Sequence, residues 1–285
     1  MRLTDLTMCG ADRAATVGYR VSSEPMSDHG KATIMTAADD EGDRIRVALV
    51  TGGTGGMGRV IAAKLAADGF DVAVAYAGSV DLADATVKEI AGQGRRGAAF
   101  AADIADEEAT SAVFDVVEDR FGHVDVVVHT AGINRPAALT DLDLADLDEI
   151  HRVNVRGSFV VNQQAARRVR DGGSIVNVST SMVRVAPPEL SVYAASKAAV
   201  DVLTRILAKE LRARDITVNA VAPGPTATAA FLDSTSAEEQ EQLAALPPLG
   251  RLGRPDDIAG VVSFLVGPAG RWVNGQVVYA NGGLA

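Results

Sequence analysis

A tyrosine and a lysine stand four residues apart in the segment Tyr193-Ala-Ala-Ser-Lys197. On a helix this spacing places the two side chains on one face, one turn apart. A tyrosine phenol ordinarily has a pKa of about 10, too high for a base near neutral pH, and a neighbouring ammonium favours the phenolate. The pair therefore predicts acid–base chemistry in which Tyr193 gives a proton to, or takes one from, a substrate oxygen.

The segment from Thr51 to Gly58 reads Thr-Gly-Gly-Thr-Gly-Gly-Met-Gly, and it lies between a predicted strand and a predicted helix. Glycine permits tight turns and a close approach of the backbone to a pyrophosphate. Free N–H groups at the start of the following helix can then hold negative charge. Gly53, Gly55 and Gly58 also match the spacing G-x-G-x-x-G, so the segment predicts a dinucleotide site.

Short apolar segments alternate with helical ones from residue 45 onward. Predicted strands cover 47–50, 72–76, 98–101, 124–129, 174–179, 216–221 and 277–280; predicted helices cover 59–68, 82–91, 107–120 and 193–212, and another ends near 170. This alternation is typical of βαβ units, and strands that are apolar on both faces indicate helices on both sides. We therefore predict an α/β fold, a Rossmann-like doubly wound parallel sheet of about seven strands.

The net charge and the counts of cysteine and histidine argue against several classes of partner and site. The chain of 285 residues has 27 Lys and Arg against 37 Asp and Glu, a net charge of −10, which argues against nucleic acid or an anionic membrane as a partner. The single cysteine allows no internal disulfide, and the four scattered histidines form no metal-ligand pair. No apolar run approaches the ~18 residues of a spanning helix, so we expect no membrane insertion, no metal and a cytoplasmic location.

The first part of the chain differs from the rest. Residues 1–44 lack the sustained periodicity of a helix or strand, which predicts a disordered tail, with a regulatory arm as the alternative. Residues 45–285 carry the alternating pattern without a linker or internal repeat. We therefore predict one dinucleotide-binding domain over 45–285.

Thr51, Gly52, Gly56 and Gly58 form the pattern Thr-Gly-x-x-x-Gly-x-Gly, and the Tyr-x-x-x-Lys pair follows the fifth predicted strand. In this order, over about residues 45–285, the motifs resemble the short-chain dehydrogenase/reductase family, in particular its 3-oxoacyl-carrier-protein-reductase-like branch. The resemblance implies an NAD(P)-dependent enzyme that moves a hydride between nicotinamide and a small ketone or secondary alcohol, and a homotetramer. The alternative is a non-catalytic dinucleotide sensor or scaffold on the same fold.

The resemblance implies two further catalytic side chains. The family places a serine after the fifth strand, usually thirteen residues before the tyrosine, where it stabilises an oxyanion. Thr180 stands thirteen residues before Tyr193, whereas a shift of one residue brings Ser181 into place; we prefer Ser181 for its less crowded hydroxyl and keep Thr180 open. Asn154 matches the family's Asn-x-x-Gly, in which the asparagine completes a proton relay with the lysine.

The cofactor contacts that the loop and the resemblance imply are spread over the predicted strand ends. They are Gly52, Thr54, Gly56, Met57, Gly58, Ser79, Asp103, Ile104, Ala131, Gly132, Tyr193, Lys197, Pro223, Gly224, Thr226 and Thr228. His129 and Thr130 stand where the family usually has two asparagines. We predict that His129 is a packed, hydrogen-bonded residue rather than a metal ligand or an acid–base group.

The end of the second predicted strand, Tyr76-Ala-Gly-Ser79, bears on the choice of cofactor. NAD-binding folds usually offer an acidic side chain there to the ribose 2′-hydroxyl, and this segment has none. Ser79 could donate to a 2′-phosphate, although Gly55 replaces the loop arginine of many NADP-preferring relatives. We therefore predict NADP(H), with NAD(H) as the alternative.

Three other segments carry weaker signals. Residues 227–248 are rich in Ala, Glu, Gln and Thr and predict a helical lid over the substrate. Arg167, Arg168 and Arg170 form a small basic cluster, which either docks a carrier protein or caps its helix. The apolar segment 272–279 suits either a subunit interface or the core.

Overall fold

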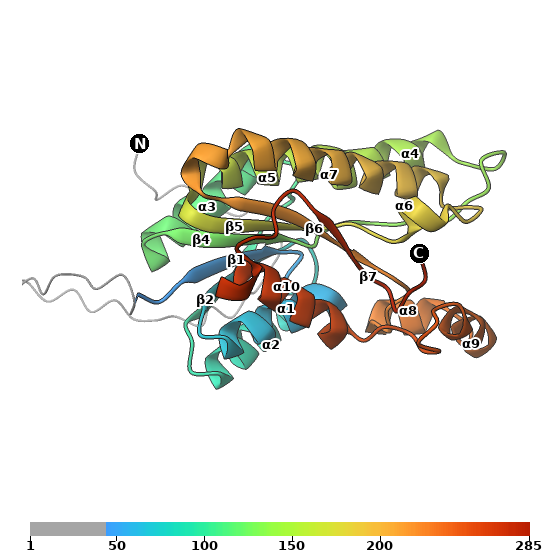
Figure 1. Cartoon of the computed structure of the whole chain (residues 1–285), viewed down its shortest axis with the longest axis horizontal. Helices are drawn as coiled ribbons and strands as arrows, with labels where there is room; N and C mark the ends of the chain where they lie inside the picture. Colours follow the sequence, from blue (N-terminus) through green and yellow to red (C-terminus); the bar gives the residue numbers. More distant parts are fainter. Residues whose placement is uncertain (1–43) are drawn as a thin grey trace, which may run out of the picture. The chain divides into compact units, whose positions relative to one another are not determined.

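Seven parallel strands form one sheet, which confirms the predicted Rossmann-like doubly wound fold (Figure 1). They are β1 (Val47–Thr51), β2 (Asp71–Tyr76), β3 (Gly97–Ala101), β4 (Val124–His129), β5 (Val169–Val178), β6 (Thr217–Pro223) and β7 (Val277–Ala280). Their order across the sheet is β3-β2-β1-β4-β5-β6-β7. A computed structural model describes residues 44–285, so the predicted tail lies outside the described residues apart from Arg44.

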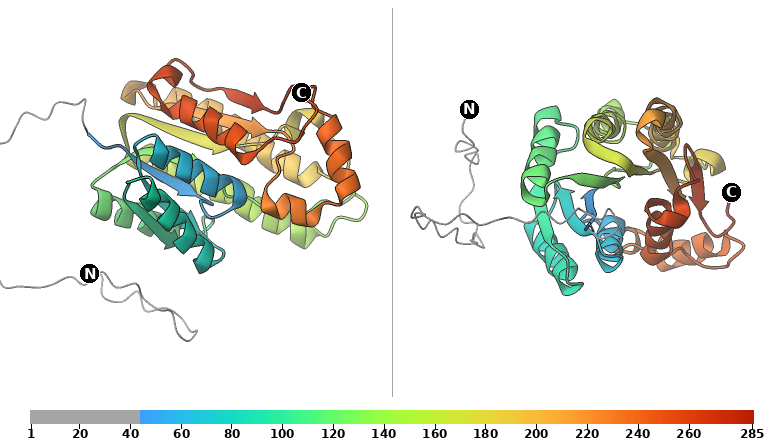
Figure 2. Two further views of the ribbon diagram at one scale, coloured as in Figure 1. Left: turned by 90° about the horizontal axis from the view of Figure 1, so that it is seen from below. Right: turned by 60° about the vertical axis from the view of Figure 1, so that its left-hand side comes forward.

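Long helices cover both faces of the sheet (Figures 1 and 2). On one face lie α1 (Gly56–Ala67), α2 (Val80–Gly92) and α10 (Pro255–Val266); on the other lie α3 (Glu107–Phe121), α5 (Gly157–Arg168) and α7 (Ser191–Glu210). Two buried apolar clusters fill the spaces between, one joining Leu49 to Phe114 and the other joining Val50 to Ile61. Successive residues of β1 thus face opposite layers, which explains why the strands are apolar throughout.

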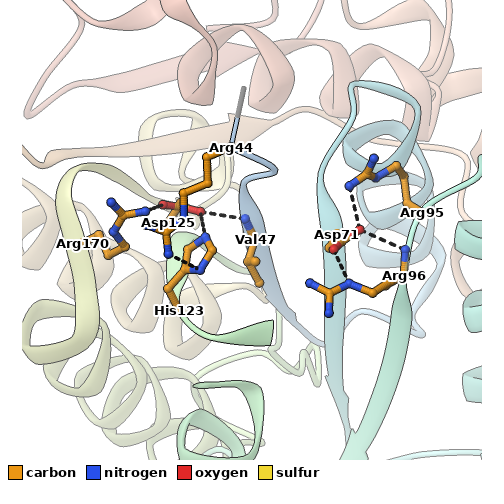
Figure 3. A network of polar contacts seen from close by, with 8 residues as sticks. All are labelled: Arg44, Val47, Asp71, Arg95, Arg96, His123, Asp125 and Arg170. Carbon is orange, nitrogen blue, oxygen red and sulfur yellow. Dashed lines mark hydrogen bonds and ion pairs between the residues drawn. The ribbon is translucent and has the colours of Figure 1, made fainter. Parts of the chain in front are cut away.

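Two buried carboxylates tie the strands together at the amino-terminal edge of the sheet (Figure 3). Asp125, on β4, accepts a hydrogen bond from the backbone N–H of Val47 at 2.7 Å. Asp71, the first residue of β2, forms ion pairs with Arg95 at 2.8 Å and Arg96 at 2.6 Å. Buried carboxylates require such partners. Both groups lie at the opposite ends of their strands from the glycine loop, so they stabilise the sheet away from the site.

The helices differ from the prediction at two places. The predicted long helix is divided into α4 (Leu144–Ile150), the π-helix η1 (His151–Arg156) and α5, after which β5 begins. The N–H of Gly157 donates to the carbonyl of Arg152, five residues earlier, as in a π-helix. Helix α10 is absent from the sequence prediction, although Pro255 in its first turn and the Asp257 carboxylate that accepts from the N–H of Arg254 mark its start.

The strand order reverses between β1 and β4, and in such sheets ligands bind at this point, beyond the carboxyl ends. Short helices lie beyond these ends in Figure 1. They are α6 (Met182–Val185), α8 (Ala229–Ser234) and α9 (Ala237–Ala245). None of the helices in residues 44–285 combines the length and apolarity that a membrane crossing requires.

Candidate active site

The glycine loop comes so close to its surroundings that side chains would not fit. Gly52 has a φ of +70°, in the left-handed region that favours glycine. A Cβ at Gly58 would lie 2.3 Å from the carbonyl oxygen of Gly52, and one at Gly56 would lie 2.8 Å from the Cβ of Thr228. Gly55 precedes α1 without a side-chain cap, so the first helical N–H groups remain available to an anion. This cradle fits a dinucleotide pyrophosphate.

A cavity of about 1140 Å³ opens beside this loop. Its lining joins the loop to the carboxyl ends of β2, β3 and β4. The predicted cofactor residues that line it are Gly52, Thr54, Gly56, Met57, Gly58, Ser79, Asp103, Ile104, Ala131, Gly132 and Thr228. Its size and glycine-rich wall fit the dinucleotide that the motifs imply.

Ser79 lies where β2 leads into α2. Its Oγ accepts a hydrogen bond from the N–H of Leu82 at 3.4 Å, which leaves the hydroxyl hydrogen free to donate. Among residues 44–285, the end of β2 carries no acidic side chain toward the cavity, because Asp71 lies at the other end of the strand. This end of the cavity therefore has no carboxylate that would repel a 2′-phosphate.

Asp103 follows β3 and is held by two donors. One carboxylate oxygen accepts from the N–H of Ala105 at 2.9 Å and the other from Arg152 at 2.7 Å. Burial raises the pKa of Asp103, but these hydrogen bonds outweigh it and lower the pKa below its usual value. Arg152 also pairs with Glu149 and lines the cavity, a role that the sequence analysis missed because η1 is distant from β3 along the chain.

A second cavity, of about 440 Å³, adjoins the first. The two share part of their lining, namely Met57, Thr130, Gly132, Ile133 and Thr228. The other predicted site residues in the second cavity are Thr180, Tyr193, Lys197, Pro223, Gly224 and Thr226. The structure therefore brings the proposed acid–base residues next to the dinucleotide cavity.

Tyr193 and Lys197 lie one turn apart on α7, as their spacing predicts. Burial raises the pKa of the Tyr193 phenol, and a hydrogen bond with Thr180 lowers it only in part. Burial also lowers the pKa of Lys197 to about 8, although the charge of Asp201 raises it. The lysine Nζ donates to the carbonyl of Val178 at 2.9 Å. The net pKa shift of Tyr193 is therefore upward, opposite to the sequence expectation, because the loss of water on burial outweighs the effect of Thr180.

Thr180 and Ser181 have different surroundings although they are adjacent. Thr180 lines the second cavity, and its hydroxyl is near enough to Tyr193 to lower the pKa of the phenol. Ser181 is 0% exposed, is absent from the lining, and donates its hydroxyl to the carbonyl of Ala222 at 3.1 Å. The geometry therefore favours Thr180, and it departs from the sequence-based preference for Ser181.

Asn154 is fully buried in η1 and lines neither cavity. Its Oδ1 accepts from the N–H of Ile133 at 2.8 Å, and its Nδ2 donates to the carbonyl of Ile133 at 2.8 Å and to Ser196 Oγ at 3.0 Å. A Cβ added to Gly132 would lie 3.1 Å from Lys197 Nζ and 3.2 Å from Asn154 Oδ1. The amide therefore holds the segment after β4 against α7, close to the lysine.

Apolar side chains that the sequence analysis did not select complete the second cavity. They are Met182, Leu190, Phe231 and Leu243. The last two come from α8 and α9, inside the predicted lid segment 227–248. Leu190 stands three residues before Tyr193, a helical spacing that could have pointed to a shared face.

Known proteins are similar to this chain in sequence and in fold. A family model described as enoyl-(acyl carrier protein) reductase matches residues 52–285. An NADPH-dependent aldehyde reductase-like protein of Arabidopsis thaliana is 38% identical over 252 residues, 84% of this chain and 93% of the relative. A 3-oxoacyl-[acyl-carrier-protein] reductase of Staphylococcus aureus is 39% identical over 239 residues, which cover 83% of this chain and 97% of the relative. The solved structure of a Burkholderia cenocepacia short chain dehydrogenase in complex with NADP is 42% identical, with a TM-score of 0.79 and coverage of 84% and 97%. Together with the site geometry, these matches show that the chain belongs to the short-chain dehydrogenase/reductase family.

Proposed function

We propose that the chain reduces the carbonyl group of a small, uncharged ketone or aldehyde with NADPH. The observation that carries the proposal is the adjacency of the Thr180 and Tyr193 side chains on the wall of the second cavity, with Lys197 one helical turn away. Two hydroxyl groups that converge in this way can both donate to one carbonyl oxygen. A dinucleotide sensor without catalysis would not need this constellation, so the non-catalytic alternative is disfavoured.

The polar residues of the second cavity suit the reducing direction. Because burial raises the pKa of Tyr193, the neutral phenol predominates near pH 7 and can donate to the carbonyl oxygen. As the carbonyl carbon accepts a hydride, negative charge develops on its oxygen, where the Thr180 hydroxyl stabilises it and Tyr193 transfers its proton. Lys197, with a pKa of about 8, is mostly an ammonium at pH 7 and stabilises the phenolate that remains.

NADPH supplies the hydride when it is bound. In this proposal the N–H groups of the loop 52–58 hold its pyrophosphate, Asp103 and the backbone at Ile104 hold the adenine, and Lys197 holds the ribose next to the nicotinamide. Ser79 donates to the 2′-phosphate. The absence of an acidic side chain at the end of β2 within residues 44–285 supports NADP(H) over NAD(H), as does the NADP in the Burkholderia relative.

The lining of the second cavity indicates the polarity and charge of the substrate that it could bind. Within the described part of the chain, Lys197 is the only charged side chain that lines it. Much of the remaining wall is apolar, formed by Met182, Leu190, Phe231 and Leu243. This wall can bury an apolar substituent, and apart from Lys197, which acts on Tyr193 in the proposed reaction, the cavity has no cation to pair with a carboxylate or phosphate of the substrate.

An acyl group on a carrier protein is the second candidate, which the name of the Staphylococcus relative favours. Such a partner would call for a basic docking surface near the cavity. Arg167 and Arg168 are instead the last residues of α5, and Arg170 lies at the start of β5, at the amino-terminal edge of the sheet. Arg168 is paired with Asp115 and Arg170 with Asp125, so this cluster serves the fold rather than the site.

The exposed apolar side chains favour self-association, and we propose a homotetramer. Phe159 on α5 and Val202 and Ile206 on α7 are 47–52% exposed on the outer surface of these helices, and Trp272 is 99% exposed. Burial of such side chains against another subunit would remove apolar surface from water. Light scattering of the purified chain would measure the assembly. The cytoplasmic location stays a prediction.

The proposed function is tested by following the absorbance of NADPH with a panel of apolar ketones and aldehydes and their carboxylated analogues. We expect turnover of the apolar compounds and poor turnover of the charged ones. Tyr193→Phe should lower kcat by about 10²- to 10⁴-fold while NADPH still binds. Tyr279→Phe, on β7, serves as the matched control and should leave kcat unchanged. Binding of NADPH without turnover of any compound would overturn the proposal.

A further inference from the structure

A chain of buried hydrogen bonds runs from the glycine loop to Asn154, and its central link is His129. Thr51 and His129 are register partners at the ends of β1 and β4, and Thr51 Oγ1 lies 2.7 Å from His129 Nδ1. His129 Nε2 lies 2.9 Å from Ser158 Oγ, and Ser158 Oγ donates to the backbone carbonyl of Asn154 at 2.5 Å. All four residues are at most 2% exposed, so bulk water does not compete for these contacts.

The direction of each hydrogen bond follows from the donors available. A serine hydroxyl has one hydrogen, and Ser158 gives it to the carbonyl of Asn154. Ser158 Oγ must therefore accept at its contact with His129, which assigns the ring hydrogen to Nε2. The Nδ1 of the neutral ring then accepts from the hydroxyl of Thr51. In this one arrangement, each of these hydrogen-bond donors and acceptors has a partner.

The series of hydrogen bonds continues from Asn154 to α7, the helix that carries Tyr193 and Lys197. Asn154 Nδ2 donates to Ser196 Oγ at 3.0 Å, and Ser196 Oγ donates to the backbone carbonyl of Tyr193 at 2.7 Å. The same amide holds both backbone groups of Ile133. A displacement of η1 would therefore move Asn154 away from both the segment after β4 and α7.

We propose that His129 is a positioning residue. Through Ser158 it holds η1 in the position from which Asn154 forms hydrogen bonds with Ile133 and Ser196. The catalytic part of this inference rests on the proposed reductase function. An asparagine at position 129 would place its amide near the ring position of Nδ1, where it could still contact Thr51. It would be too short to reach Ser158, so the histidine makes a connection that the smaller side chain leaves out.

Two substitutions separate the two contacts of the ring. His129→Asn retains a partner for Thr51 and loses Ser158, whereas His129→Gln places an amide near Nε2 and can still donate to Ser158. Ser158→Ala removes the same link from the other side. Thr204→Val is the matched control, because Thr204 is 0% exposed and accepts from Asn177, the β5 register partner of His129, and forms no hydrogen bond with η1.

The first measurement is hydrogen exchange at the amide of Ile133, which donates to Asn154. We expect faster exchange there in His129→Asn and Ser158→Ala, and rates close to those of the unaltered protein in His129→Gln and Thr204→Val. This readout needs no substrate, so it tests the positioning even if the proposed reductase function fails. Equal exchange in His129→Asn and His129→Gln would overturn the inference.

The second measurement is the split between kcat and KM with NADPH and a ketone that the unaltered protein reduces. A misplacement of about 1 Å can cost about 10²-fold in rate, so we expect His129→Asn and Ser158→Ala to lower kcat by about 10- to 100-fold with little change in KM. His129→Gln should restore most of kcat. A comparable loss in Thr204→Val would mean that general destabilisation explains the effect, and would overturn the inference.

Discussion

Thr180 and Tyr193 lie side by side at the wall of the second cavity, whereas the next residue, Ser181, turns its hydroxyl to the carbonyl of Ala222. The two neighbouring hydroxyls therefore have different tasks. Thr180 is placed to donate to a substrate oxygen beside the phenol. Ser181 joins the turn after β5 to the end of β6, at the base of the same site.

Substitution of the two hydroxyl residues separates these tasks. Thr180→Val removes one donor to the developing oxyanion and should lower kcat by about 10²- to 10³-fold. Thr180→Ser keeps the hydroxyl and should retain most of the activity. Ser181→Ala should cost about 1 kcal/mol of unfolding free energy and leave kcat within a few-fold. Steady-state kinetics measures kcat, and urea unfolding measures the free energy of unfolding. A larger loss of kcat in Ser181→Ala than in Thr180→Val would contradict the assignment of Thr180 as the oxyanion donor.

The charge state of Lys197 should set the alkaline limb of the activity profile. Burial lowers its pKa to about 8 and Asp201 raises it, so loss of Asp201 should lower the pKa further. The ammonium is then lost at lower pH, and kcat/KM for reduction should fall at lower pH in Asp201→Asn than in the unaltered protein. Asp215→Asn makes the same change of charge at an exposed site and should leave the limb in place. An unmoved limb in Asp201→Asn would contradict this account.

Much of the fold could be predicted because its signals are local. Each strand is an apolar run between turn residues, and the predicted strand 124–129 has the bounds of β4. Helix α10 is absent from the sequence prediction, although Pro255 marks its start and Ile258, Val262 and Leu265 recur at helical spacing. The π-helix has no comparable local signal. Its wide turn depends on contacts with Ile133 and Ser196, which lie far away in the sequence.

The candidate site shows the same division between local motifs and distant contacts. The glycine loop and the pair Tyr193 and Lys197 are contiguous motifs, so the sequence alone placed them. The choice between Thr180 and Ser181 depends on where β5 ends, and a shift of one residue along a strand reverses the direction of a side chain. The role of Ser158 depends on its contact with His129 across two elements, which no spacing in the sequence reveals.

The preference for NADPH should depend on Ser79. Its hydroxyl hydrogen is free to donate, and a single hydrogen bond contributes about 0.5–1.5 kcal/mol. Ser79→Ala should therefore weaken NADPH binding by about 2- to 12-fold and leave NADH binding almost unchanged. Titration of the protein fluorescence with each cofactor measures this ratio. Equal weakening for both cofactors would show that the substitution disturbs α2, which Ser79 caps, rather than 2′-phosphate recognition.

His129 should make the fold sensitive to acid. Burial, and next the charge of Lys197, lower its pKa in the folded chain to about 3 from 6.5. Between these values the unfolded chain binds a proton that the folded chain excludes, so the free energy of unfolding falls as the pH decreases below 6.5. The contribution of one such group is about 1.4 kcal/mol per pH unit.

His129→Gln removes this titration while keeping an amide in the hydrogen-bond chain. Urea unfolding at several pH values between 4.5 and 7 should therefore show a shallower acid-dependent loss in the variant than in the unaltered protein. His123 also titrates with a pKa lowered first by burial, so part of the slope should remain in His129→Gln. Parallel pH profiles for the unaltered protein and His129→Gln would mean that the buried ring accepts a proton without unfolding, which contradicts the assignment of Nδ1 as the acceptor from Thr51.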